Sequence, residues 1–170
     1  TLSLHDALPI YYEALAKFLF CFLCAKGTDK IRLSIDRTEW DFGQKQNNIL
    51  MIIASRGDFT IPLYWVMLDN NSGNSNSDDR IALLKKCIAL IGAENIGLVL
   101  GDREFIGQVW LKFLKSQKIP FCVRIPKNHS ITSEDGTIYH AETLWLQRKS
   151  TPIRFQSAMV DGVWGSVLID

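Results

Sequence analysis

Residues 31–40, Ile-Arg-Leu-Ser-Ile-Asp-Arg-Thr-Glu-Trp, decide the fold of this chain. Apolar residues at positions 31, 33 and 35 alternate with polar ones, which is the pattern of a strand with one face in a core. The strand delivers Asp36 at its end, where a carboxylate is held rigidly enough to be aimed at a metal or a substrate. A lone aspartate more often caps a turn. Asp36 therefore indicates a site only if a second carboxylate lies beside it.

The segments that follow predict a mixed sheet covered by helices. Hydrophobic periodicity, turn residues and apolar runs give the order helix, three strands, helix, strand, helix, strand. This order favours an α/β fold with a five-stranded mixed sheet and flanking helices. The expected elements are a helix over Tyr11–Cys24, a connecting turn over Thr38–Asn47, hairpin strands Asn48–Ser55 and Thr60–Met67 around Arg56-Gly-Asp-Phe, a helix capped by Ser77 or Asp78 and ended by Gly92, a strand over Asn95–Leu100, a helix over Glu104–Gln117 and a strand over Pro120–Ile125.

The remainder, Pro126–Asp170, reads as the start of a second, β-rich element. It contains a turn at Ser133-Glu-Asp-Gly-Thr, and Trp145, Phe155 and Trp164 lie in short β-type runs. We expect three regions: an N-terminal leader and linker helix over 1–30, the first part of the core domain that carries Asp36 over 31–126, and the beginning of a β-rich element over 127–170. Residues 1–10 resemble translated adapter sequence, so they are left out of the fold prediction.

Composition and charge exclude several classes of protein. A hydrophobic content of 47% with 22% charged residues excludes wholesale disorder. The longest apolar run, Phe18–Ala25, is too short to span a membrane. Among the four cysteines only Cys21 and Cys24 are closely spaced, and no histidine lies nearby, which argues against a zinc site. Four cysteines in 170 residues do not make a disulfide scaffold, which favours a reducing cytosol.

The segment from Arg103 to Lys127 contains six basic residues and one acidic residue. This excess of positive charge suits either a surface that faces a polyanion or a solvated helix face.

A second aspartate, Asp102, follows the fourth predicted strand. If the first and fourth strands are neighbours, Asp36 and Asp102 face each other at one edge of the sheet. Paired carboxylates suit Mg²⁺ or Mn²⁺, and two such ions can activate a water or hydroxyl and stabilise the leaving oxygen in phosphoryl transfer. Asp102 also precedes a helix, so the alternative is an N-cap.

Four separated motifs resemble the cut-and-paste bacterial transposases of the insertion-sequence four group. They are Ser34-Ile-Asp-Arg-Thr-Glu-Trp40, Pro62-Leu-Tyr-Trp65, Gly73-Asn-Ser-Asn76 and Gly101-Asp-Arg-Glu-Phe-Ile-Gly107, and the resemblance runs from about Tyr11 to Ile125. It implies a ribonuclease-H-like core with an Asp, Asp, Glu metal-binding triad, whose aspartates fall on Asp36 and Asp102. It further implies two Mg²⁺ or Mn²⁺ ions, double-stranded DNA as substrate, a homodimer on paired transposon ends and a bacterial cytoplasmic location.

The third carboxylate of that family, a glutamate in a Tyr-Arg-Glu-Lys-type signature, has no match here. Glu134 and Glu142 lie too early and in another context. We therefore expect a fragment that ends inside the insertion and is inactive alone. Two other interpretations stay open: a ribonuclease-H-like host nuclease that uses the same aspartates, and a catalytically dead DNA-binding remnant.

Other polar residues carry weaker expectations. Basic side chains near the two aspartates could contact DNA phosphates, although a solvated surface role is the alternative for each. His129 and His140 lack carboxylate or cysteine partners at ligand spacing, so both are interpreted as surface residues. The family places aromatic residues of the insertion near a flipped base, but neither Trp145 nor Trp164 matches a particular position. The residues expected to contact DNA are Arg37, Lys45, Arg103, Lys112, Lys115 and Lys127; Arg103 and Glu104 also match the family residues after the second aspartate.

Overall fold

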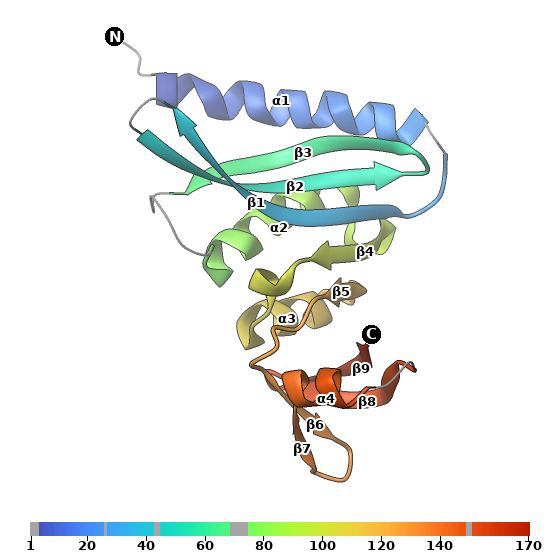
Figure 1. The fold of residues 1–170 in the computed structure, drawn as a ribbon. Helices are drawn as coiled ribbons and strands as arrows, with labels where there is room; N and C mark the ends of the chain where they lie inside the picture. The colour runs from blue at the N-terminus through green and yellow to red at the C-terminus, as the bar shows by residue number, and fades with distance from the viewer. Residues whose placement is uncertain (1–3, 26, 43–44, 69–74, 149–150) are drawn as a thin grey trace.

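The computed structural model describes residues 4–25, 27–42, 45–68, 75–148 and 151–170, and of residues 4–11, 40–42 and 45–46 it describes the backbone alone. The first part of the chain follows the predicted order of helices and strands (Figure 1). Its elements are α1 (Leu4–Ala25), β1 (Ile31–Phe42), β2 (Lys45–Arg56), β3 (Phe59–Leu68), α2 (Ser77–Ile91), β4 (Ile96–Gly101), α3 (Gln108–Ser116) and β5 (Phe121–Val123), with short 3₁₀ turns η1 (Ala93–Asn95) and η2 (Arg103–Phe105).

These strands form one five-stranded sheet in the order β3-β2-β1-β4-β5. Strands β1, β2 and β3 pair antiparallel, whereas β4 pairs parallel to β1, and β5 pairs parallel to β4. The two parallel strands are reached through the helical crossovers α2 and α3, as parallel pairing requires. The predicted five-stranded mixed sheet is confirmed, and its order and strand directions are those of a ribonuclease-H-like core.

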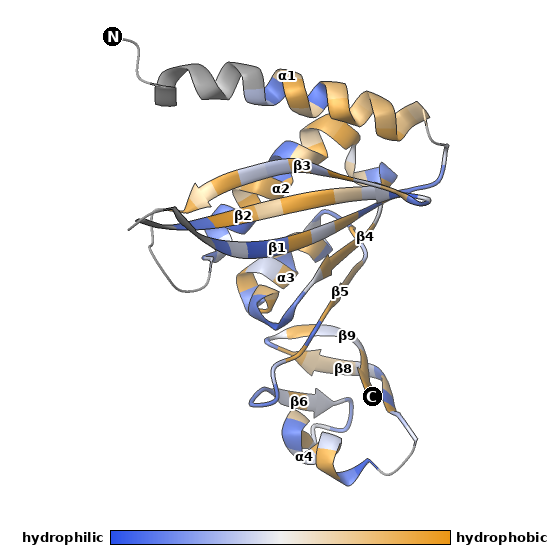
Figure 2. Ribbon diagram, turned by 45° about the horizontal axis from the view of Figure 1, so that its top comes forward, coloured by the Kyte–Doolittle hydropathy of each residue, from blue (hydrophilic) through white to orange (hydrophobic). Residues whose placement is uncertain are grey.

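Apolar side chains from the sheet and all three helices build the main core. In β1, Ile31, Leu33 and Ile35 are buried, as the alternation predicted, and Trp110, Tyr64 and Phe105 are the largest fully buried side chains of this core. Figure 1 shows α1 running alongside β3, and the Tyr12 hydroxyl exchanges hydrogen bonds with the Trp65 backbone of that strand. In Figure 2 a hydrophilic stretch of β1 stands out against the apolar parts of β2 and β3. No helix in the described part of the chain is long and apolar enough to cross a membrane.

Several predicted boundaries are wrong, each for a local reason. Strand β1 does not end at Asp36, and the expected turn over Thr38–Asn47 is mostly strand, because β1 and β2 continue as a paired ribbon out to Phe42 and Lys45. Two strands that pair mainly with each other need no alternating apolar face, so their polar composition misled the prediction. The expected turn at Arg56-Gly-Asp-Phe is confirmed, with Gly57 at a positive φ of 57°.

The helices also differ in detail. Helix α1 begins at Leu4, before the predicted start at Tyr11. The cap of α2 is Asn76 rather than Ser77 or Asp78, since its side chain accepts a hydrogen bond from the Asp79 amide. The predicted helix over Glu104–Gln117 is split into η2 and α3, because Gly107 adopts a φ of 139° that no helix allows.

Residues beyond β5 form a second, smaller sheet. Strands β6 (Ser130–Ser133), β7 (Ile138–His140), β8 (Ile153–Val160) and β9 (Val163–Ile169) are arranged in the order β7-β6-β8-β9, with helix α4 (Ala141–Gln147) between β7 and β8. The turn after Ser133 is confirmed, whereas Trp145 lies in α4 and not in a β-type run. Val163, at the start of β9, is buried in the main core, so the tip of this β8–β9 hairpin contacts the first sheet's helices.

We expect Gly101→Ala to destabilise the core and Gly165→Ala to leave it nearly unchanged. A Cβ at Gly101 would lie 2.9 Å from Phe105 Cβ and 3.4 Å from Ile35 Cγ2, whereas one at Gly165 would meet nothing within 4 Å. Overpacking at such a site costs about 1–3 kcal/mol. Urea denaturation followed by far-ultraviolet circular dichroism measures both variants, and equal midpoints for the two would contradict the close approach of β4 to Phe105.

Candidate active site

The two predicted aspartates lie beside each other at the end of the parallel pair β1–β4. Ile35 pairs with Gly101, and this is the last pair of the parallel ladder. Asp36 and Asp102 are the next residues on the two strands, and neighbouring strands are about 5 Å apart. The expected adjacency of the first and fourth strands is therefore found. It brings together two carboxylates that are 66 positions apart in the sequence (102 minus 36).

Both carboxylates are open to solvent. Asp36 is exposed, and its Oδ1 accepts a hydrogen bond of 2.8 Å from the Arg37 backbone amide. Asp102 makes no side-chain cap bond to the turn η2 that it precedes, so the N-cap alternative is not found. Its Oδ1 lies 3.5 Å from Nη1 of Arg124, but the two side chains are 50% and 81% exposed. An ion pair so exposed contributes little and leaves the carboxylate accessible.

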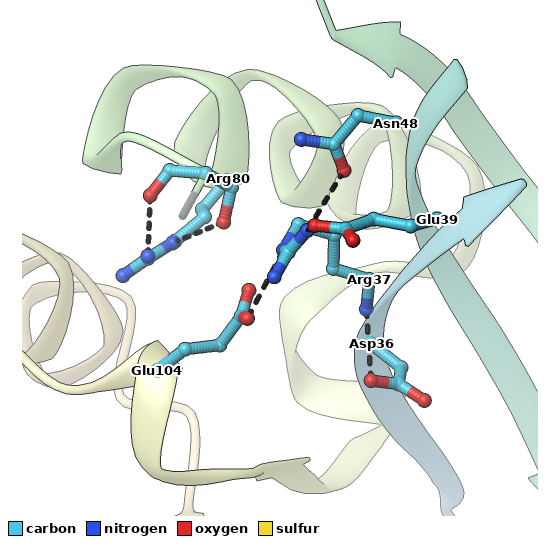
Figure 3. A network of polar contacts seen from close by, with 7 residues as sticks. Asp36, Arg37, Glu39, Asn48, Arg80 and Glu104 are labelled. Atoms are coloured by element: carbon cyan, nitrogen blue, oxygen red, sulfur yellow. Dashed lines mark hydrogen bonds and ion pairs between the residues drawn. The ribbon is translucent and has the colours of Figure 1, made fainter. Parts of the chain in front are cut away.

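Arg37 and Glu104 link the two strand ends by a partly buried ion pair (Figure 3). Arg37 Nε lies 3.1 Å from Glu104 Oε2, and the side chains are 15% and 19% exposed. Arg37 Nη1 also lies 2.5 Å from Glu39 Oε1 and 3.2 Å from Asn48 Oδ1. Its pKa is raised, first by the hydrogen bond to Glu39 and then by Glu104 against the opposing effect of burial. The guanidinium therefore stays charged, and it donates hydrogen bonds to Glu104, Glu39 and Asn48.

A second guanidinium, that of Arg80 on α2, lies on the other side of the same network. Arg80 is 4% exposed and stacks over the Phe105 ring at 5.1 Å. Its Nε donates to Ser75 Oγ at 2.8 Å, and other nitrogens donate to the backbone carbonyls of Ser75 and Ile106. Burial lowers its pKa, and the carboxylates of Glu104 and Asp79 counteract that shift. An arginine remains protonated under these conditions, so Arg80 places a buried positive charge beside Glu104.

A groove of about 500 Å³ opens next to this network, between the α2 N-terminus, η2 and the second sheet. Arg80, Arg103 and Glu104 line one side of it, and His129 and Asp161 line the other. Nδ1 of His129 lies 3.3 Å from Asp161 Oδ1, and both side chains are mostly buried. The interpretation of His129 as a surface residue without a carboxylate partner is therefore wrong, because the partner is on the distant β8–β9 hairpin. His140 is exposed, as expected.

The basic residues expected to contact DNA lie in different settings. Arg103, Lys112, Lys115 and Lys127 are exposed, whereas Arg37 is held in the network just described. Lys115 Nζ donates to the Trp164 carbonyl, and Lys127 Nζ lies 3.2 Å from Glu142 Oε1. The side chain of Lys45 lies outside the described part of the structure, as do Gly73 and Asn74 of the third family motif.

The pair Asp36 and Asp102 fits a small divalent cation. Mg²⁺ is typically held by one or two carboxylates and keeps several waters, and both aspartates present free, solvent-accessible oxygens at one strand end. Within the ranges that the structure describes, no group of three or more His, Cys, Asp and Glu side chains could hold a metal ion. The candidate metal ligands at this strand end are thus the two aspartate carboxylates.

No protein-family model matches the chain, and no curated protein matches it. Among solved structures, it is similar to a chain of the simian T-cell lymphotropic virus intasome in complex with PP2A regulatory subunit B56 gamma (15% identity, TM-score 0.42) and to the HTLV-2 integrase catalytic core domain in complex with magnesium, in its dimeric form (13%, 0.43) and its trimeric form (13%, 0.41). These matches cover 61%, 58% and 56% of this chain. The chain spans 35%, 63% and 60% of the matched chains, less than two thirds of each.

Sequence reasoning did not find the charged network. Arg80 was not assigned to the site, Glu104 was noted only as a match to the family residues after the second aspartate, and Arg37 was expected to face DNA rather than carboxylates. One signal was available: Arg80 precedes Leu83 and Leu84 by one helical turn, which places it on the buried face of α2. A charge on a buried helix face needs compensation nearby, but nothing in the sequence says which carboxylate provides it.

We expect Arg80→Met to destabilise the protein by about 1–3 kcal/mol, because it leaves buried acceptors and the Glu104 carboxylate without their cationic partner. Arg103→Met is the matched control, since Arg103 lines the same groove but is exposed. Urea denaturation midpoints measure the difference. A stability of Arg80→Met equal to that of Arg103→Met would show that the buried guanidinium contributes nothing to the fold.

Proposed function

We propose that this chain carries the first part of the catalytic core of a DNA-cutting polynucleotidyl transferase of the Asp, Asp, Glu type, and specifically of a cut-and-paste transposase of the insertion-sequence four group. The observation that supports this most is the placement of Asp36 and Asp102 directly after the last pair of the parallel strands β1 and β4. The motifs around both aspartates support the finer assignment. In this proposal residues 31–126 are the core, and residues 127–170, with their own sheet, begin the inserted element.

Asp36 and Asp102 are the residues that would hold Mg²⁺ or Mn²⁺. Divalent ions bound by carboxylates can lower the pKa of a water or hydroxyl and stabilise the leaving oxygen of a phosphodiester. The contribution of this chain is to fix two carboxylates on rigid strands and to keep them free of other strong partners. Among the described residues, the Asp36 carboxylate accepts a hydrogen bond from a backbone amide, and that of Asp102 pairs with the exposed Arg124. The described residues place no third His, Cys, Asp or Glu side chain with these two.

DNA would approach over the exposed basic residues near these aspartates. Arg103 directly follows Asp102, and Lys112 and Lys115 lie on the next helix, α3. Lys127 follows β5, which is the neighbour of β4. Cationic side chains of this kind bind phosphates without reading sequence. Arg37 contributes less to such a surface, because two carboxylates and an amide oxygen already occupy its donors. A homodimer on paired DNA ends is part of the same proposal.

Replacing either aspartate should weaken divalent-cation binding. We expect Asp36→Asn and Asp102→Asn each to reduce the affinity of the chain for Mn²⁺ by about tenfold or more, because each removes one of two charged ligands. Asp58→Asn is the matched control, as Asp58 is an exposed aspartate in the β2–β3 turn. Electron paramagnetic resonance of free Mn²⁺ gives the dissociation constants. Equal affinity in all four proteins would contradict the proposed metal site.

Strand cleavage should require more than this chain. We expect the 170-residue chain not to cut transposon-end DNA in Mg²⁺, whereas an enzyme extended through the third carboxylate should cut it and join the 3′ end to target DNA. In that enzyme Asp36→Ala or Asp102→Ala should abolish cleavage and spare end binding. Gel assays of labelled duplexes measure both steps. Cleavage that survives Asp36→Ala would refute the assignment, and hydrolysis without joining would indicate a nuclease instead.

A further inference from the structure

The parallel ladder between β1 and β4 stops immediately before the two aspartates. Ile35 and Gly101 form its last pair, so no further backbone pairing between these strands holds Asp36 and Asp102 together. Beyond that point β1 continues with β2, whereas the chain after β4 turns away into η2. The ladder therefore places the two aspartates side by side, and contacts after its last pair can fix their separation further.

One side-chain bridge crosses this gap. Arg37 is the residue after Asp36, and Glu104 is the second residue after Asp102. We propose that the Arg37–Glu104 ion pair is a clamp that fixes the distance between Asp36 and Asp102, and that both are positioning residues for the cation that the aspartates bind. This inference rests on the function proposed above. It assigns to Arg37 and Glu104 a role that acts through the two aspartates rather than on the substrate.

The position of the clamp suits this role. Successive residues of a strand point to opposite faces, so Asp36 faces solvent while Arg37 points inward. Figure 3 shows the Asp36 carboxylate turned away from the Arg37 guanidinium, and the Glu104 carboxylate directed at that guanidinium. The clamp thus leaves the carboxylate of Asp36 free and acts through the backbone of β1 and η2.

The clamp is also rigid at both ends. Arg37 is held on β2 by Asn48 Oδ1 at 3.2 Å, and Asn48 is only 1% exposed. On the other side, Glu104 Oε1 is buried and has no hydrogen-bond partner among the described residues. The buried charge of Arg80 acts on the same carboxylate, and Phe105, next to Glu104, is fully buried beneath that guanidinium. Coulomb attraction is strong where water is largely excluded, so the Arg37 guanidinium, 3.1 Å from Glu104 Oε2, holds this carboxylate in place.

The test compares Mn²⁺ affinity in wild type, Arg37→Met, Glu104→Gln, the double variant and Glu39→Gln. Outer residues that orient metal ligands typically contribute about 10–100-fold to affinity, so we expect each clamp variant to weaken Mn²⁺ binding about tenfold. The double variant should lose no more than either single one, because one bridge is broken in all three. Glu39→Gln is the matched control: it also removes a carboxylate from Arg37, but Glu39 lies on the same strand and is 41% exposed.

Hydrogen–deuterium exchange gives a second readout that does not depend on metal. The Phe105 amide donates to the Asp102 carbonyl at 2.9 Å, and the Arg37 amide donates to Asp36 Oδ1. Both amides should exchange faster in Glu104→Gln, while the amides of β2 and β3 remain as in wild type. If Glu104→Gln does not fold, Arg37→Lys replaces it, since lysine keeps the charge and loses the planar fork that reaches Glu104.

The outcomes separate the two proposals. Mn²⁺ binding that depends on Asp36 but is unchanged in Arg37→Met and Glu104→Gln would overturn the clamp and leave the proposed function intact. A loss of Mn²⁺ affinity in Glu39→Gln as large as that in Glu104→Gln would also overturn the clamp, because breaking the bridge between the two strand ends would then have no effect of its own. If wild type itself shows no Mn²⁺ binding that depends on Asp36, the proposed function fails, and the clamp has no cation site to serve.

Discussion

The parallel pairing of β1 with β4 is the constraint on which the rest of the structure depends. It joins strands that are far apart in sequence, and the connection between them contains the β2–β3 hairpin and the crossover helix α2. The ladder needs Gly101 at its end, because a side chain there would meet Phe105. Phe105 in turn fills the core beneath β4 and carries Arg80 on its face. The same few residues therefore end the ladder, fill the core and bring two aspartates to one strand end.

The charges around this strand end are arranged in two groups with different exposure. Asp36 and Asp102 are accessible to water and have weak partners, which suits ligands that must bind a cation. Arg37, Glu104 and Arg80 are largely buried and compensate one another. Burying a charge without a partner costs several kcal/mol, so each of these three depends on its neighbours. Their burial and mutual contacts distinguish them from the two exposed aspartates.

Local patterns in the sequence predicted much of this fold. The alternation in residues 31–35 identified β1, and the apolar runs and turn residues identified the other four strands of the first sheet. Errors arose where a feature depends on contacts distant in sequence. Thr38–Phe42 belongs to the range expected to be a turn yet forms strand because it pairs with β2, and Trp145 lies in a helix although its surroundings suggested a strand. His129 finds its carboxylate, Asp161, only because the β8–β9 hairpin returns to α3.

The candidate site also combines a feature that local sequence patterns predicted with one that depends on contacts distant in sequence. That Asp36 and Asp102 are neighbours follows from strand order, which the element pattern and the family motifs made predictable. That Arg37 pairs with Glu104 does not follow, because strand alternation says only that Arg37 points opposite to Asp36. A basic residue beside a catalytic aspartate suggests a phosphate contact when sequence alone is considered. Once the inward face of β1 is known to meet η2, the same arginine has two carboxylates within reach, the exposed Glu39 on its own strand and the partly buried Glu104 on η2. One dipeptide thus supplies a metal-accessible carboxylate on one face of the strand and an interior cation on the other.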